Sequence, residues 1–576
     1  MVTELDTYAP APQSQATPVQ EAAAQFDPRR WSALLALLLA AFMDLLDGSI
    51  VNVAIPQMQK DLGASYAAIQ WVTAGYALSF AVLLITGGRL GDIFGRKRIF
   101  LVGVVGFTLA SLLCGVAQSE AMLVAARFIQ GSFSALMIPQ ILSIIQVTFP
   151  EGERVKAFGL YGAVVGVATV SGPLLGGKLV EANLFGLEWR PIFLINLLVG
   201  AVALAAVIIR VRESKSPHAL RLDPIGVVLV TTGLLLLLYP LVQGRDLGWP
   251  IWVFALMLAA VPVLVAFALY ERRKKRIDDS PLVELSLFKQ RSFVVGLLIG
   301  MVFFSGIASF FLVFTLYLQI GLGFSPLASG LTGLPFSLGS IITSALASTL
   351  AVRLGKNVLV IGMPLLVLGM ATTMVTINLA GIGLTGWDLA PAMFISGLGL
   401  GMVIAPVADI ILAGIHGREA GSASGVLNTT FQVGGAIGLA LVGVIFFGLL
   451  SGRSSASVDA VTPQVNAGLQ QIGIPAPVQG MILDSFRVCF SDRMAEKDPF
   501  VIPPSCQQSQ SQSSLVSPEV GQQIGTVLTQ AANDALKYNF TDAMRTALWY
   551  EIGVFALAFL LVFFLPARPP NAVVAV

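Results

Sequence analysis

The chain has 576 residues, of which 56% are hydrophobic and 11% are charged, and its mean hydropathy is +0.83. A typical soluble domain is about 25% charged, so this composition predicts an all-α membrane protein with many spans. The net charge of +2 gives no electrostatic case for a nucleic-acid partner. The three cysteines and two histidines form no metal-binding pattern, so we expect no metal and no cofactor.

The N-terminal residues 1–30 are rich in Ala, Pro, Gln and Thr, which predicts a disordered cytoplasmic tail. The first apolar run, residues 31–56, is too long for the hydrophobic region of a signal peptide, so we expect it to remain as the first span. About 20 residues at a rise of 1.5 Å cross the hydrocarbon of a bilayer.

This first span carries two carboxylates, Asp44 and Asp47. An ionised Asp at the middle of a bilayer costs at least about 2.5 to 3.5 kcal/mol, and such residues commonly mark an ion or substrate pathway. Their i, i+3 spacing places both on one helix face. We interpret this face as lining a central cavity, where at least one of the two exchanges protons. Asp44 is either a second proton or cation site or a residue wetted by the cavity.

About fourteen apolar runs are long enough to span a membrane. They lie near residues 32–56, 67–87, 98–117, 121–148, 156–180, 190–210, 223–243, 250–270, 292–320, 325–350, 357–379, 386–411, 421–449 and 543–566. Lys and Arg in the short loops gather on one side if both termini share that side, which predicts a plasma-membrane protein with cytoplasmic termini. We interpret the cations at 272–276 as an anchor to anionic lipid, with a phosphate-binding or targeting role as the alternative.

The only large hydrophilic segment, residues 450–542, then lies outside the cytoplasm and ends in an amphipathic helix near residues 516–536. It holds Cys489 and Cys506. In an oxidising compartment these two predict a disulfide within the loop. Two unpaired thiols are the alternative, because sequence alone does not show that their Cα atoms come within bonding range.

The loop after the second span reads Gly88-Arg-Leu-Gly-Asp92-Ile-Phe-Gly95-Arg96, followed by two further cations. Its glycines permit close helix packing and a sharp turn, and Asp92 can cap or pair with a neighbouring helix N-terminus. In this position the loop closely resembles the signature loop of the major facilitator superfamily. The resemblance implies a conformational latch formed by Gly88, Asp92, Gly95 and Arg96.

Further segments resemble the same superfamily in the expected order. Arg127-Phe-Ile-Gln130-Gly131 is similar to its buried-arginine motif, and segments 46–56 and 189–196 resemble its fourteen-span drug:proton antiporter family. Ala168 stands where the antiporter-type motif of the fifth span has glycine. The matching residues of that motif are Gly159, Gly172, Pro173, Gly176 and Gly177.

The resemblance implies two six-helix bundles with two inserted helices, and a monomer. We expect the first bundle at 31–212, the inserted helices at 213–291, the second bundle at 292–449 and 543–566, and a cytoplasmic tail at 567–576. An internal repeat supports this division, because residues 348–356 align with 88–96, although Val352 replaces the Asp. In a transporter built from repeats the substrate site lies between the halves.

Asp47 and Arg127 lie at a similar depth, about eight or nine residues from the outer ends of their spans. Movement of the two relative to each other would switch the proton affinity of Asp47 between states. The alternative is a permanent ion pair that only orders the helices. Other polar residues in the spans are candidates to line the cavity, or to form ordinary interhelical hydrogen bonds. They are Asn52, Gln70, Tyr76, Gln130, Asn428 and Gln432.

These patterns predict a proton-coupled secondary exporter that moves amphiphilic, cationic drugs by alternating access, in contact with membrane lipid. The alternative is a dedicated exporter of one endogenous metabolite, lipid or antibiotic. An enzyme is not expected, because the sequence has no HExxH motif, nucleophile elbow or P-loop. A receptor built around the outer loop conflicts with the latch loop and the antiporter-type fifth span.

Overall fold

The computed structural model describes residues 29–215, 221–412, 420–496, 502–506 and 518–566, and within these ranges all regular structure is helical. The predicted tails therefore lie outside the described residues, except for Arg29 and Arg30. The first six long helices are α1 (Arg30–Leu62), α2 (Tyr66–Phe94), α3 (Arg96–Gly115), α4 (Glu120–Thr148), α5 (Glu151–Ala182) and α6 (Pro191–Arg210), with the short η1 (Leu184–Gly186) before α6.

The rest of the chain begins with the pair α7 (Pro224–Leu247) and α8 (Ile251–Asp278). The next group comprises η2 (Leu285–Lys289), α9 (Arg291–Leu316), the π turn η3 (Tyr317–Gly321), α10 (Pro326–Thr332), α11 (Leu334–Leu354), α12 (Asn357–Ala380), η4 (Gly381–Gly383), α13 (Ala390–Leu412) and α14 (Ala420–Gly452). The last helices are α15 (Ser454–Gln471), α16 (Ala476–Ala495) and α18 (Pro518–Val562).

Serine caps mark where several of these helices begin. The hydroxyls of Ser65, Ser119 and Ser325 accept hydrogen bonds from backbone N–H groups three residues further on, at 3.2, 3.3 and 3.2 Å. Each bond satisfies a donor that the first turn of a helix leaves free. In an apolar medium such donors have no water to bind, so these caps help to fix the ends of α2, α4 and α10.

Small residues bring the helices of each group close together. A Cβ at Gly87 of α2 would lie 2.1 Å from the backbone oxygen of Ala135 in α4, and one at Gly397 of α13 would lie 1.9 Å from that of Phe336 in α11. Backbones in such contact are typical of membrane helices, where packing replaces the hydrophobic effect. The pairs α2–α4 and α11–α13 occupy the same serial positions in the two groups, as expected for a repeat.

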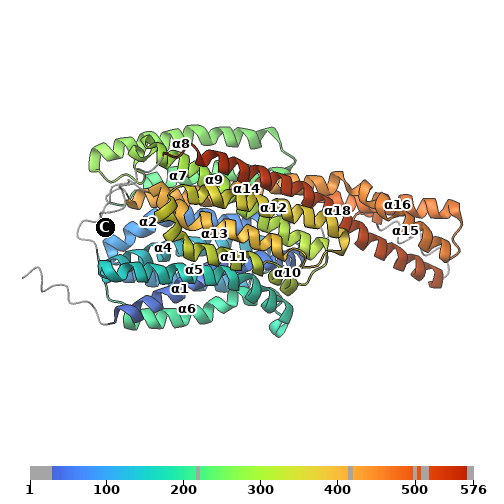
Figure 1. The fold of residues 1–576 in the computed structure, drawn as a ribbon, viewed down its shortest axis with the longest axis horizontal. Coiled ribbons are helices and arrows are strands. Elements are labelled where there is room, and N and C mark those ends of the chain that lie inside the picture. The colour runs from blue at the N-terminus through green and yellow to red at the C-terminus, as the bar shows by residue number, and fades with distance from the viewer. Residues whose placement is uncertain (1–28, 216–220, 413–419, 497–501, 507–517, 567–576) are drawn as a thin grey trace, which may run out of the picture.

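Twelve helices of the described residues are long and apolar enough to cross a membrane. α5 and α11 are not among the twelve, but α5 packs along α1, and α11 packs along α13 (Figure 1). The count of fourteen spans therefore stays a prediction. The apolar run at 325–350 is divided at Gly333, where α10 ends and α11 begins.

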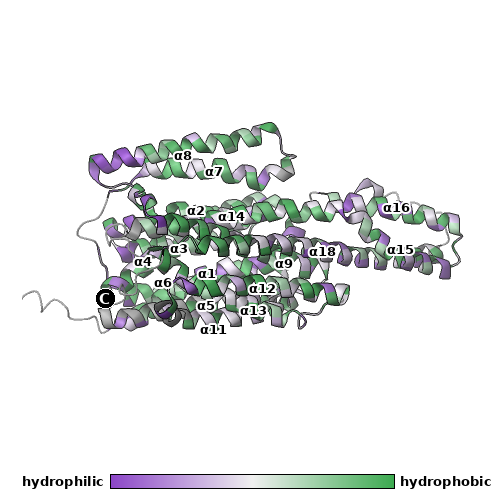
Figure 2. Ribbon diagram, turned by 45° about the horizontal axis from the view of Figure 1, so that its top comes forward, coloured by the Kyte–Doolittle hydropathy of each residue, from purple (hydrophilic) through white to green (hydrophobic). Residues whose placement is uncertain are grey.

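The two groups of helices meet through α2 and α14 and through α5 and α10. Gln70 donates a hydrogen bond to the carbonyl of Leu439 at 3.2 Å, and Thr429 donates one to the carbonyl of Ala81 at 2.9 Å. α7 and α8 pack beside each other along one flank, where α7 contacts both α2 and α14 (Figure 2). The limits of the two bundles and of the inserted pair stay predictions.

A helical extension, formed by α15, α16 and the first part of α18, projects from one end of the bundle (Figure 1). It has its own apolar core, which includes Val461, Leu469, Phe486 and Phe490. A disulfide joins Cys489 and Cys506, whose Cα atoms are 4.6 Å apart, as the sequence predicts. The predicted amphipathic helix is also present, but it continues without a break into the last span, so that α18 is 45 residues long.

Candidate functional site

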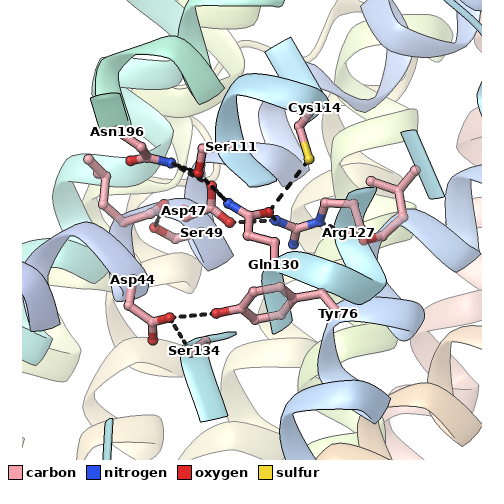
Figure 3. A network of polar contacts seen from close by, with 12 residues as sticks. Asp44, Asp47, Ser49, Tyr76, Ser111, Cys114, Arg127, Gln130, Ser134 and Asn196 are labelled. Carbon is pink, nitrogen blue, oxygen red and sulfur yellow. Dashed lines mark hydrogen bonds and ion pairs between the residues drawn. The ribbon is translucent and has the colours of Figure 1, made fainter. Parts of the chain in front are cut away.

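A polar network lies inside the first helix group and is centred on Asp47 of α1 (Figure 3). The Asp47 carboxylate is 0% exposed. Arg127 of α4, which is also buried, donates to its Oδ2 at 2.5 Å through Nη1. The two ionisable residues that the sequence places at similar depth therefore form a direct ion pair. Such a pair resists separation, because a lone charge in this interior would be strongly destabilised.

The second oxygen of Asp47 is held by two amides. Gln130 of α4 and Asn196 of α6 both donate to Oδ1, at 2.9 and 2.8 Å. Gln130 also donates to the hydroxyl of Ser111 in α3 at 2.8 Å. The carboxylate thus connects α1, α4 and α6, and α3 joins through Ser111, which accepts from the amides. The charged form of Asp47 is satisfied by one guanidinium and two amide donors.

Arg127 has several partners besides Asp47. Its Nε donates to the carbonyl of Val72 in α2 at 2.9 Å, and its Nη1 donates to Oε1 of Gln130 at 2.5 Å. The guanidinium carbon lies 4.3 Å from the centre of the Tyr76 ring, a cation–π distance. If Asp47 lost its charge, these contacts would still hold the guanidinium in place.

Asp44 occupies a separate position one turn away. Its Oδ1 accepts hydrogen bonds from the hydroxyl of Tyr76 at 2.6 Å and from the hydroxyl of Ser134. Since the ring of Tyr76 also packs on Arg127, this tyrosine connects the two carboxylates. No cation pairs with Asp44 among the described residues, so its environment differs from that of Asp47.

Both carboxylates are buried in this conformation, and their place beside a central cavity stays a prediction. Asp44 is 7% exposed, and α3, α4 and α6 contribute the side chains that enclose Asp47. Gln130 and Tyr76, which the sequence predicts to line the cavity, belong to the network around the two carboxylates. The face of α1 that carries the two carboxylates points into its own bundle of helices.

The other predicted cavity residues lie elsewhere. Gln70 is buried at the junction of α2 and α14. Asn52 of α1 and Gln432 of α14 are half-buried, and Asn428 of α14 is exposed. Their roles in binding stay predictions.

The latch residues lie at the turn from α2 to α3. Gly95 has φ +113°, a conformation that favours glycine, and a Cβ there would lie 2.6 Å from the carboxylate of Glu213. Arg96 pairs with Asp92 at 2.8 Å. The Glu213 carboxylate accepts from the backbone N–H groups of Lys97 and Arg98, at 3.0 and 3.2 Å, and so caps α3. Gly88, the remaining latch residue, faces Pro139 with room for a Cβ.

The antiporter-type residues of α5 face both groups of helices. Gly172 and Gly176 pack against Ser49 and Ile50 of α1. On the opposite side, a Cβ at Gly177 would lie 2.7 Å from the backbone oxygen of Pro326 in α10. Pro173 and Gly330 of α10 are in similar backbone contact. Gly159 lies in the same helix. These residues therefore place α5 between α1 and the second group.

The sequence interpretation missed several polar residues that the structure shows to be buried, and three of them belong to the sites of the buried carboxyl groups. Ser111 and Ser134 gave no signal, because serine is common in membrane helices. Glu551 of α18 is 0% exposed and did give a signal, since it is an ionisable residue within the last apolar run. The rule that singles out Asp44 and Asp47 should have found it.

A bundle of long apolar helices with charged side chains buried between them is typical of a polytopic membrane protein. Comparison with known families agrees, because the sequence profile described as Major Facilitator Superfamily matches residues 37–242 and again residues 221–439. The chain belongs to this superfamily, and it is a membrane transporter of small molecules rather than an enzyme.

Individual relatives indicate which kind of transporter within the superfamily this chain resembles. The chain is 44% identical over 94% of its length to the probable actinorhodin transporter of Streptomyces coelicolor, covering 92% of that protein. It is 40% identical over 76% of its length to the puromycin resistance protein pur8 of Streptomyces alboniger, covering 86% of it. The chain thus falls among the exporters of the superfamily.

Similarity to a solved structure supports the assignment of the fold, and only of the fold. A bacterial homologue of the human lysosomal transporter Spinster, in an inward-facing and occupied conformation, is 16% identical with a TM-score of 0.55. The match covers 94% of this chain and 99% of that one.

Proposed function

We propose that this protein is a proton-coupled antiporter that exports an amphiphilic small molecule of the antibiotic type by alternating access. The observation that carries the proposal is the ion pair between Asp47 and Arg127, enclosed within a membrane-spanning bundle. Ionisable residues at such depth are costly and commonly serve ion or proton pathways.

Coupling follows from the chemistry of this pair. A proton that binds Asp47 removes the charge that attracts Arg127, and the guanidinium keeps its contacts with Val72, Gln130 and Tyr76. Neutralisation therefore loosens α1 from α4 without leaving an unpartnered cation. Because α5 packs on both α1 and α10, a change in α1 can reach the contact between the halves. Each charge that crosses 100 mV supplies about 2.3 kcal/mol.

The structure also supports the proposed orientation. The disulfide of the helical extension suits an oxidising compartment. The hydrophilic end of α8, which contains Lys275 and Arg276, lies at the opposite end of the bundle (Figure 2). We therefore place both termini in the cytoplasm and the extension outside, with fourteen spans in the plasma membrane and a monomer as the unit.

One observation supports an amphiphilic substrate, and another supports a dedicated exporter of one antibiotic. A cavity of about 360 Å³ between α2, α7, α8 and α14 has walls that are mostly apolar, including Ile85, Phe267 and Val426. This suits an amphiphile with a large apolar part. A dedicated exporter of one antibiotic is the second candidate, because the relative named as an actinorhodin transporter matches nearly the whole chain, the extension included.

Efflux from proteoliposomes under an imposed pH gradient tests the coupling, with substrate and internal pH followed together. Wild type should move substrate against protons, and Asp47→Asn should lose both fluxes. Glu181→Gln, which removes an exposed carboxylate from α5, is the control and should behave as wild type. If Asp47→Asn retains coupled fluxes, this residue is not the coupling site, and Asp44→Asn is the next variant to measure.

The panel of substrates separates the two candidates. It contains actinorhodin, puromycin and a lipophilic cationic dye. Transport of all three supports a broad drug exporter, and transport of actinorhodin alone supports the dedicated one. If wild type moves none of them and no proton flux appears, the exporter proposal fails for this panel.

A further inference from the structure

The second helix group contains a buried carboxyl of its own, Glu551 in α18. It is 0% exposed, and its Oε1 accepts a hydrogen bond from the hydroxyl of Ser309 in α9 at 2.6 Å. Its other oxygen, Oε2, is buried and has no hydrogen-bond partner among the described residues. A carboxylate has about four acceptor positions, so the charged form would be poorly satisfied here.

The helices packed against this part of α18 offer no cation. α12 and α14 contain no Asp, Glu, Lys or Arg, and α9 carries only Arg291, at its first residue. On α18 itself the nearest cation is Arg545, which lies near Asp542 at 3.9 Å. The titratable neighbour of Glu551 is the phenol of Tyr550. Phe303, Gly306 and Phe555 make the surroundings apolar.

Glu551 corresponds in position to the Asp47 site of the first half. There, α1 and α6 are the first and last helices of the half, and Asn196 of α6 donates to Asp47 of α1. In the second half, α9 and α18 are the first and last helices, and Ser309 of α9 donates to Glu551 of α18. Ser309 is the nineteenth residue of α9 and Asp47 the eighteenth of α1. The carboxyl has thus moved from the first helix to the last, at similar depth.

The two halves differ in their cations. α4 supplies Arg127 to the first carboxylate. In the second half the corresponding helix is α13, whose sequence from Ala390 to Leu412 contains neither Lys nor Arg. The first site is therefore a charged pair, and the second is a carboxyl without a countercharge. An isolated charge in such surroundings is far less stable than the neutral acid.

From this geometry we propose that Glu551 is a second proton-binding site, so that each half of the transporter carries a protonatable carboxyl. In the present conformation Glu551 holds its proton on Oε2, and Asp47 is ionised against Arg127. The proton comes from water on one side of the membrane and is released to water on the other when α9 and α18 separate. No other bond changes. This inference rests on the proposed proton coupling.

The number of protons moved per substrate tests the transport role. If one proton is lost from the cycle, the steady substrate gradient at an imposed difference of one pH unit falls about tenfold, since one unit is worth about 1.4 kcal/mol per proton. Glu551→Gln should show this fall, because Gln keeps the bond to Ser309 but binds no proton. Glu519→Gln, in the extension part of the same helix, is the control and should match wild type.

Infrared spectroscopy tests proton binding independently of transport. Purified wild type at neutral pH should show the carbonyl stretch of a protonated carboxylic acid, absent in Glu551→Gln and shifted in Glu551→Asp. Thermal melting of the variants shows that each is folded. An infrared spectrum of Glu551→Gln that equals that of wild type in the carbonyl region of protonated acids, or an unchanged gradient in that variant, overturns the inference. If wild type shows the band but moves no protons, the proposed function fails while proton binding by Glu551 stands.

Discussion

Arg127 and Asp47 set the energetics of the first half at the scale of single residues. Arg127 contacts Val72, Gln130 and Tyr76 as well as the carboxylate, so its loss affects more than one interaction. Asp47 depends on Arg127 more strongly than Arg127 depends on Asp47, because the two amides that also hold the carboxylate carry no charge.

This asymmetry predicts a result for a double-mutant cycle. Arg127→Ala should lower the stability of the folded protein by about 3 to 5 kcal/mol, because it leaves Asp47 buried without a countercharge. Adding Asp47→Asn should restore part of this lost stability, since the amide then present at position 47 needs no countercharge. Thermal melting in detergent measures each variant. A loss in the double variant equal to the sum of the losses in Arg127→Ala and Asp47→Asn alone would show that the ion pair contributes nothing.

The meeting of these two residues could be predicted from the sequence, because depth in a membrane helix follows from residue counting. The partners could not. Gln130 and Asn196 reach Asp47, and Ser111 accepts from both amides, only because α3, α4 and α6 pack at particular rotations about their axes. Hydropathy does not contain that information. For the same reason the sequence did not show that side chains of α4 and α6 enclose Asp47.

At the scale of helices, close backbone contacts decide how α5 and α10 fit together. A Cβ at Gly177 would lie 2.7 to 3.0 Å from backbone atoms of Pro326 and Leu327, which a rigid helix does not accommodate. The contact joins the two halves at the end of the bundle that carries the extension.

We predict that Gly177→Ala pushes α5 and α10 apart and favours conformations open at that end. Transport should fall by tenfold or more, because one state of the cycle is destabilised by about 1 to 3 kcal/mol through overpacking. Labelling of a cysteine introduced at Asn52 reports the opening. Gly448→Ala in α14, where a Cβ meets nothing within 4 Å, is the matched control. Unchanged labelling and transport would refute this role.

Arg89 connects the end of α2 to the inserted helices. The side chain is buried and donates to the carbonyls of Arg221 and Ser280 at 2.9 and 3.2 Å, and to that of Pro281. These carbonyls lie in the segments that precede α7 and follow α8. The latch loop therefore also holds the inserted pair, which its sequence did not indicate.

Replacing Arg89 with Ala should release this connection. Hydrogen bonds to charged groups are worth about 1.5 to 3 kcal/mol each, so we expect a local loss of about that size at least. Amide hydrogen exchange near residues 280–283 should accelerate, and α7 and α8 should become more accessible to protease at their ends. Arg98→Ala, which removes an arginine with a 71% exposed side chain, should leave exchange unchanged. Similar behaviour of both variants would argue against the connection.

The helix limits show why some elements are easier to predict than others. Interior spans such as α3 and α6 begin and end within a few residues of the predicted runs, because their polar flanks are sharp. The sequence predicts the two parts of α18 as separate elements, near 516–536 and at 543–566, because hydropathy detects only the part that crosses the membrane and not its continuity with the polar part. The break at Gly333 depends on packing and left no mark in hydropathy.

At the scale of the whole molecule, the extension is stabilised by its apolar core and by the Cys489–Cys506 bond. The bond closes a loop of 17 residues, for which chain entropy predicts about 3 kcal/mol. Replacing both cysteines with serine should increase hydrogen exchange in α16 and at residues 503–506 by a matching factor, with little change in the membrane helices. Reduced wild type should behave in the same way. Protection that is unaffected by the replacement would mean that the core alone holds the extension.

The continuity of α18 has a mechanical consequence. From Glu551 to Pro518 the helix runs about 50 Å at 1.5 Å per residue, and α15 packs against it. A small rotation of the second half about the membrane centre is therefore magnified at the tip, by about 0.9 Å for every degree over this length. The far end of the extension should therefore move measurably during the transport cycle. A fluorophore placed at this end would report the conformational changes of the transporter from outside the membrane. An antibody bound there would slow these changes.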